Sequence, residues 1–112
     1  MDAAAAQQFW DHVAPLLANG TLEQGTIMGG ACVRAGGELV AMAHHKGPGL
    51  VVKLTRERAA DLITRGEGLP FAPAGKVFKE WVLIPDYRPE LWDALLEEGR
   101  TLAAGRHHGN RR

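Results

Sequence analysis

The sequence predicts an α+β domain of two layers, in which helices flank an antiparallel sheet of about four strands, in the order α-β-β-β-α-β-α. Three observations support this class. Apolar residues such as Phe9 and Val13 recur at helical spacing near the N-terminus. Gly36-Gly37 separates two short apolar segments, which is typical of a two-residue β-hairpin turn. Residues 50–54 are almost continuously apolar, as expected for a central strand buried on both faces.

The N-terminal half is predicted to hold one helix and three strands. Asp2 can cap the first helix, and Asn19-Gly20 can end it. Pro15 falls inside the helical pattern, which predicts a kink or an early end. We expect strands at residues 26–34, 38–43 and 50–54, each bounded by residues that favour turns.

The C-terminal half is predicted to hold two helices and one strand. Thr55 caps a short helix over residues 56–64, and a loop of Gly, Pro and Ala follows over residues 66–75. Residues 76–84 show the clearest strand pattern, which Pro85 ends.

The last helix is expected over about residues 90–104, with Leu91, Leu95 and Leu102 as its core stripe and Gly105 as its end. The chain therefore predicts a single domain over residues 1–105 and a basic, flexible tail over residues 106–112.

Composition excludes several classes of function. Lys and Arg number 13 and Asp and Glu number 13, so the net charge is +0 and there is no chain-wide basic field for nucleic acid. A single cysteine excludes an internal disulfide and a zinc site built from cysteines, and the absence of serine excludes a serine nucleophile. No apolar run approaches the roughly 18 residues that span a bilayer, and the N-terminus is acidic. We expect a cytoplasmic protein with no membrane partner.

The order of several short motifs resembles a known family. Met28-Gly29-Gly30 precedes a Gly-Gly hairpin, and residues 50–54 precede a short helix. The segment Gly-Glu-Gly-Leu-Pro-Phe-Ala-Pro at residues 66–73 is followed by Lys-Glu-Trp-Val at residues 79–82. Over residues 25–104 this order resembles the TfoX N-terminal domain family, whose best-known members are competence regulators of the TfoX/Sxy type. It is also similar to the neighbouring MmcQ/YjbR-like proteins.

The resemblance implies an α+β fold like that of type III secretion chaperones, with no established enzyme activity, no catalytic residues and no cofactor. We therefore predict a non-enzymatic regulatory or protein-interaction module that binds a protein partner or a second copy of itself. Two alternatives stay open. One is a nucleic-acid-binding accessory protein, and the other is a protein that binds a metal or small molecule.

An interaction surface is predicted around Lys53, Lys79 and Trp81. The two lysines interrupt apolar strand patterns, and strand alternation would place Lys79 and Trp81 on one face. A lysine beside an aromatic ring can hold an anion, or a base by stacking. The plain alternative is a solvated sheet face whose lysines discourage edge pairing.

Two further tryptophans are candidates for the interaction surface. Trp10 and Trp92 lie off the main apolar stripes of their predicted helices. Tryptophan is enriched at protein interfaces, which favours a role in binding. The alternative is that each widens the core face of its helix.

Histidines provide the candidate metal ligands. His44 and His45 are adjacent, and imidazole is a good ligand for zinc, nickel and copper. Glu38 or His12 would have to complete such a site. The alternative is a solvated turn, because residues 47–49 read Gly-Pro-Gly.

The C-terminal arginines and the single cysteine are the remaining candidate functional residues. Arg106, Arg111 and Arg112 can contact phosphates, each gaining affinity by releasing counterions, or they form a solvated end. Cys32 can act as a nucleophile only if a neighbouring group activates it; in a strand beside Val33 we expect a buried, inert thiol.

Overall fold

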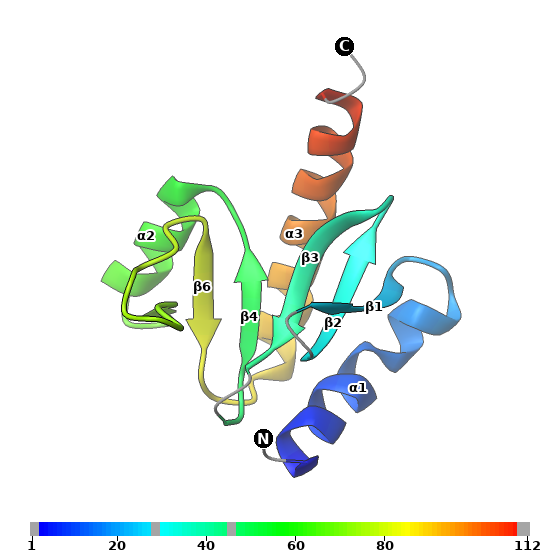
Figure 1. Ribbon diagram of the computed structural model, residues 1–112, viewed down its shortest axis with the longest axis horizontal. Helices are drawn as coiled ribbons and strands as arrows, with labels where there is room; N and C mark the ends of the chain where they lie inside the picture. Colours follow the sequence, from blue (N-terminus) through cyan, green and yellow to red (C-terminus); the bar gives the residue numbers. More distant parts are fainter. Residues whose placement is uncertain (1–2, 28–29, 45–46, 110–112) are drawn as a thin grey trace.

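The computed structural model describes residues 3–27, 30–44 and 47–109. Its helices and strands follow one another as α1 (Ala3–Ala18), β1 (Glu23–Ile27), β2 (Gly30–Ala35), β3 (Glu38–Ala43), β4 (Leu50–Lys53), α2 (Arg56–Thr64), β5 (Leu69–Pro70), β6 (Trp81–Ile84) and α3 (Pro89–Gly109). Figure 1 shows α3 running behind β3 and β4, with α1 and α2 at opposite ends of the sheet. The α+β class with an antiparallel sheet is confirmed.

The prediction of about four strands was wrong. Within the described residues the strands form one six-stranded antiparallel sheet in the order β1-β2-β3-β4-β6-β5. The segment predicted as one strand over residues 26–34 is a hairpin, because Ile27 pairs with Gly30 and Thr26 with Ala31. Apolar residues occur in both halves of this segment of the sequence, so the pattern did not show that it forms two strands.

The second additional strand is β5, which adds two residues at the edge beside β6. Pro70 lacks a backbone N–H, so it is tolerated at an edge and not in the middle of a sheet. A two-residue strand has no periodicity to detect, and this explains why residues 66–75 suggested only a loop.

The predicted strand over residues 76–84 is shorter in the structure. Only Trp81–Ile84 forms β6, because its partner β4 has four residues to pair with. Residues before Trp81 turn back toward the loop, where the Phe78 N–H donates to the Phe71 carbonyl at 2.9 Å. The premise that Lys79 and Trp81 alternate along one strand was therefore wrong.

The main core lies between the sheet and the helices. Val33, Ala41, Val52 and Val82 are aligned across neighbouring strands and are fully buried. They belong to the same apolar cluster as buried residues from each helix, namely Phe9, Val13, Ala59, Leu62, Trp92, Leu95, Leu96 and Ala103. The predicted core positions Phe9 and Val13 are confirmed.

The opposite sheet face has a smaller apolar cluster of its own. Cys32, Met42, Val51 and Leu83 line up across four strands on this face. Phe71, from the segment between β5 and β6, packs on them and is 2 % exposed. This second cluster anchors the segment that precedes β6, which carries part of the candidate site below.

The bounds of α2 agree with the prediction, whereas α3 ends later than predicted. α2 begins after Thr55, whose side chain accepts a hydrogen bond from the Arg58 N–H, as expected for an N-cap. α3 continues through Gly105 to Gly109, so the prediction that Gly105 ends it was wrong. Gly105 does not adopt positive φ, and without that reversal a glycine only weakens a helix. No helix in the described part of the chain is long and apolar enough to cross a membrane.

Candidate functional site

The predicted lysines and Trp81 do lie near one another, although not on one strand. Lys53 in β4 pairs across the sheet with Trp81 in β6. The Lys53 ammonium lies 5.8 Å from the centre of the Trp81 ring, a distance at which a cation is attracted to an aromatic face. Lys79 lies two residues before Trp81 in the turn that leads into β6 and lines the same hollow as Trp81.

This hollow is a groove of about 370 Å³ between α2 and the segment before β6. Arg56, Ala60 and Ile63 stand at positions i, i+4 and i+7 of α2, so helical geometry places them along one side. Val77, Phe78, Lys79 and Trp81 form the other wall. We call the set Lys53, Arg56, Val77, Phe78, Lys79 and Trp81 the cation–aromatic surface.

The buried ring of Phe71 supports the aromatic side chains of this surface. Phe71 is buried in the second apolar cluster, and its ring meets Phe78 edge-on with centroids 5.9 Å apart. The Trp81 ring lies 6.4 Å from the same Phe71 ring. Phe78 is nevertheless 39 % exposed and Val77 is 46 % exposed. The apolar side chains are therefore positioned by the fold and still open to a partner.

Charges of both signs surround the groove, with one more cation than carboxylate. Lys53, Arg56 and Lys79 supply three cations, while Glu57 and Glu80 supply two carboxylates. Exposed charges at such spacing interact weakly in water, but they bias which partners approach. The arrangement can hold an apolar side chain beside a carboxylate or another anion.

The two other tryptophans were predicted to belong either to an interface or to the core. Trp92 is fully buried, and its Nε1–H donates to the Asp86 carbonyl at 3.0 Å. Its assignment to the interaction surface is therefore corrected: it is a core residue. The buried stripe of α3 is centred on Trp92, Leu95 and Leu96 instead of Leu91, Leu95 and Leu102. Trp10 is partly buried against the main core and meets the Phe9 ring edge-on.

The structure describes only some of the histidines and arginines that were predicted as sites. The His44 ring nitrogen Nδ1 lies 3.4 Å from the Pro48 carbonyl, which fits a turn. His45, Arg111 and Arg112 lie outside the described residues, and Arg106 is described only as backbone in α3. Within the ranges that the structure describes, no three His, Cys, Asp or Glu side chains gather as a metal site.

Cys32 is buried between strands, as expected. Burial raises the pKa of the Cys32 thiol, and the neighbouring Arg34 guanidinium opposes this only in part. The thiolate is the reactive form of cysteine. Cys32 is therefore unreactive for two reasons: burial keeps reagents away from it, and its raised pKa favours the protonated thiol.

We expect native protein at pH 8 to react slowly with a disulfide reagent such as Ellman's reagent. One thiol per chain should react at once after unfolding in guanidinium. A C32A variant carrying T26C, which places a thiol at an exposed position of β1, provides the fast-reacting control. Equal rates for native wild type and this control would contradict a buried Cys32.

Sequence reasoning missed a second polar cluster, centred on His12 of α1. The His12 Nδ1 lies 2.9 Å from the Tyr87 hydroxyl, and its Nε2 lies 2.8 Å from an Asp93 carboxylate oxygen. The His12 ring also meets the rings of Tyr87 and Trp92 edge-on. The only sequence signal was a histidine on the core-facing side of a helix. Its partners come from more than 70 residues away, so no local pattern could reveal them.

Comparison with known proteins identifies no relative. No family model, no curated protein and no solved structure matches this chain. The resemblance to the TfoX N-terminal domain family therefore rests on the order of its short sequence motifs alone.

Proposed function

We propose that this chain is a non-enzymatic, TfoX N-terminal-like interaction module that binds a protein partner through the cation–aromatic surface. The observation that carries the proposal is the exposure of Val77 and Phe78 beside the cations Arg56 and Lys79. Exposed apolar side chains in a groove lose contact with water when a partner fills it, and this drives association.

The chemistry of the groove indicates the kind of partner. An apolar side chain of the partner would fill the space between Ile63 and Phe78, both of which line the groove. A carboxylate beside it would meet Arg56 or Lys79. We therefore expect a short segment that combines apolar and acidic residues, in the manner of helices that dock in grooves.

Peptide display tests this function directly. Peptides selected on the folded domain should be enriched in apolar and acidic residues. The change F78A should weaken a selected peptide by about tenfold or more, as is usual for an aromatic anchor. The change K79E should weaken it by introducing repulsion. Lys79 is exposed, and F78A removes an edge-on contact with Phe71, so circular dichroism should first show that both variants keep the native fold. Binding can be measured by fluorescence polarisation.

A matched control comes from another exposed aromatic residue. Tyr87 is 44 % exposed, similar to Phe78, and it does not line the groove. Y87A should leave peptide affinity unchanged. Selected peptides that bind F78A and K79E as tightly as wild type would contradict the proposed surface.

Solution mass by light scattering identifies the simplest partner. If wild type is a dimer and F78A is a monomer, the partner is a second copy of the chain.

A nucleic-acid function is the second candidate, because cations stand beside aromatic rings in the same groove. It requires single-stranded DNA binding that weakens steeply as salt rises and is lost in K79E. That result, without peptide binding, would replace the protein-interaction function.

A further inference from the structure

The two edge strands of the sheet differ in how well they are protected against pairing with another chain. At one edge β5 has two residues, and one of them is Pro70, which has no backbone N–H to donate. Short length and proline are two of the ways in which proteins protect a sheet edge. At the other edge β1 has five residues, contains no proline or lysine, and has β2 as its only strand neighbour in the described sheet. β1 is therefore the edge at which another strand can pair.

The free edge of β1 presents the backbone groups of Gln24 and Thr26. Ile27 pairs with Gly30, and only two residues separate them in the sequence, so this is a hydrogen-bonded pair of the ladder. Backbone groups alternate in direction along an antiparallel strand. Those of Ile27 and of every second residue before it point at β2, while those of Gln24 and Thr26 point away. Among the described residues, neither of these two outward N–H groups has a hydrogen-bond acceptor.

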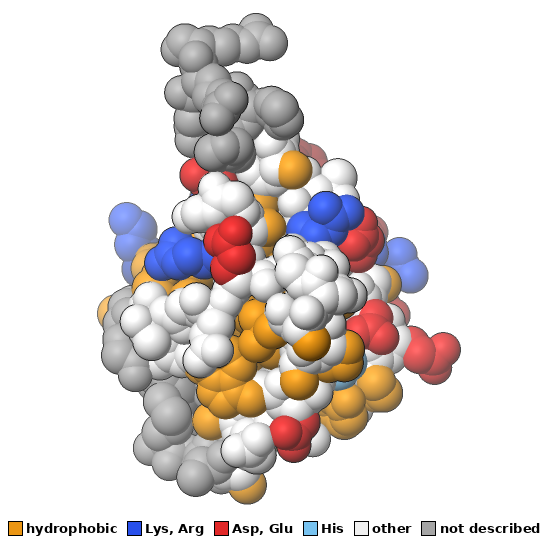
Figure 2. Space-filling model, turned by 90° about the vertical axis from the view of Figure 1, so that its right-hand side faces the viewer, with side chains coloured by type: hydrophobic (Ala, Val, Ile, Leu, Met, Phe, Trp, Pro, Cys, Tyr) orange, Lys and Arg blue, Asp and Glu red, His pale blue; other side chains and the backbone are white. Residues whose placement is uncertain are grey.

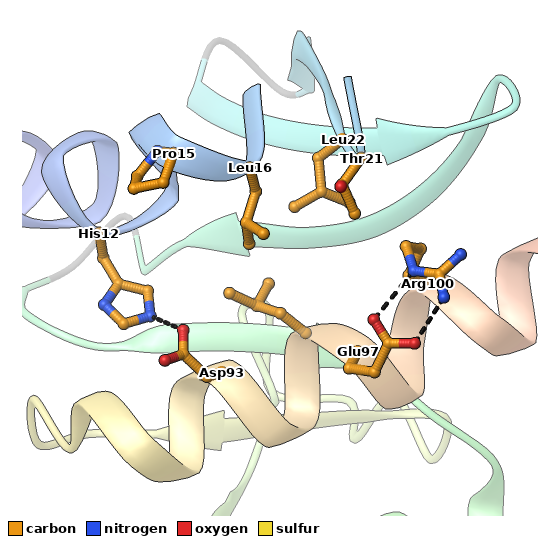
Figure 3. A pocket seen from close by; sticks show the side chains of 9 residues that line it. His12, Pro15, Leu16, Thr21, Leu22, Asp93, Glu97 and Arg100 are labelled. Atoms are coloured by element: carbon orange, nitrogen blue, oxygen red, sulfur yellow. Dashed lines mark hydrogen bonds and ion pairs between the residues drawn. The ribbon is translucent and has the colours of Figure 1, made fainter. Parts of the chain in front are cut away.

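Contacts within the chain hold the start of β1 in place. Leu22, which precedes β1, is 2 % exposed, and its N–H donates to the Leu16 carbonyl at 3.0 Å. The Leu22 side chain extends toward α3 and lines a hollow of about 340 Å³ between α1 and α3 (Figure 3). The Glu23 Oε1 accepts from the Gly37 N–H at 3.4 Å. The one charged side chain of β1 is therefore directed toward the β2–β3 turn of its own chain.

The charge of the chain allows two copies to approach each other at this edge. The net charge is +0, so there is no long-range repulsion between copies. Figure 2 shows the side of the molecule that includes α1 and β1, where side chains of both charges are interspersed with uncharged ones. Gln24 and Thr26 themselves are exposed and uncharged. A second copy of the chain is therefore electrostatically compatible with the β1 edge.

We propose that β1 pairs with β1 of a second copy of this chain, antiparallel and about a two-fold axis at Gly25. This register places Gln24 of each copy opposite Thr26 of the other, so both outward-facing residues enter hydrogen-bonded pairs. The two Gly25 residues face each other in a non-hydrogen-bonded pair, where Cα atoms approach to about 4.5 Å and glycine has no side chain to obstruct them. Glu23 lies opposite Ile27 of the second copy, so like charges do not face each other.

This pairing produces a closed dimer. It uses the β1 edge of both copies, and the β5 edges that remain are protected by Pro70, so further copies cannot add in the same way. A single strand is a small interface, so we expect a weak dimer whose population rises with concentration. β1 shares no residue with the cation–aromatic surface, so this dimer does not depend on the proposed function of that surface.

Sedimentation velocity of the full chain, from micromolar to millimolar concentration, tests the dimer. Wild type should change reversibly from monomer to dimer over this range. T26P removes an outward N–H at an edge position, where proline is tolerated, and should stay monomeric throughout. T26V keeps the N–H and should dimerise like wild type, as should F78A, which alters only the other surface. A wild type that is monomeric at millimolar concentration, or a T26P protein that dimerises equally well, would overturn the proposal.

A pair of charge variants tests the same pairing without altering the backbone. One chain carries Q24K with T26K, and the other carries Q24E with T26E, both at exposed side chains. In the proposed register like charges face each other within either homodimer, so each variant alone should be monomeric. Mixing the two variants should restore a dimer of mixed composition, because opposite charges then face each other. If each variant alone dimerises as well as wild type, or the mixture stays monomeric, the β1 pairing is wrong.

Discussion

The W92A variant is expected to lose about 3–5 kcal/mol of stability, the usual cost of deleting a large aromatic side chain from a core. Trp92 is fully buried at the start of α3. Its ring meets Tyr87 at 4.9 Å and His12 at 5.3 Å between centroids. The substitution leaves a cavity and also leaves the Asp86 carbonyl without its indole donor. Urea unfolding followed by circular dichroism measures the loss.

Two variants separate the contributions to this effect. W92F keeps most of the buried area and loses the indole N–H, so it should cost about 1–2 kcal/mol. W10A removes the same side chain from a partly buried position beside Phe9 and should cost less than W92A. A W92A protein within about 1 kcal/mol of wild type would show that Trp92 does not belong to the core.

The second large effect is expected at Gly49, where the chain enters β4. Its φ angle is +129°, a conformation that residues with side chains rarely adopt. A Cβ at this position would lie 2.8 Å from the Ile84 carbonyl oxygen and 3.0 Å from a Leu83 methyl group. Both neighbours belong to β6, so relieving the contact would move two paired strands. We expect G49A to cost about 2–4 kcal/mol.

Gly37 supplies the matched control for this substitution. Its φ angle is +82°, but no atom lies within 4 Å of the position that a Cβ would take. G37A therefore tests backbone strain alone and should cost about 1–2 kcal/mol. Thermal and urea unfolding of both variants gives the comparison. If G49A is no less stable than G37A, the close approach of Gly49 to β6 is not a constraint on the fold.

Local sequence signals succeeded where one short segment contains the whole cause. Thr55 and the apolar spacing after it define α2 with the predicted bounds, residues 56–64. Gly36-Gly37 marks the β2–β3 turn, where both glycines adopt positive φ. In each case the capping group or the turn residues lie within a few positions of the element that they shape.

Signals failed where an element depends on a distant partner. β6 begins at Trp81 because β4 is short, and β5 exists only because β6 offers it an edge. Trp92 was predicted off the core stripe because the true stripe of α3 depends on which way the helix faces the sheet. Helical spacing indicates a periodic face, while packing decides which residues lie at its centre.

Sequence signals likewise indicated one polar cluster in part and missed the other. The pairing of Lys53 with Trp81 agrees with the predicted surface, although the reason given for Lys79 was wrong. The cluster of His12 and Asp93 could not be foreseen, since its members are brought together only when α1 packs beside α3.

By itself, the sequence determined the α+β class, the α2 helix, the hairpin at Gly36-Gly37 and the buried thiol of Cys32. These follow from periodicity, capping and turn chemistry, which act over a few residues. Only the tertiary structure decided the six-stranded order, the burial of Trp92 and the two hollows. Those features depend on which surfaces of distant segments fit together, and that is settled by packing and strand pairing across the whole chain.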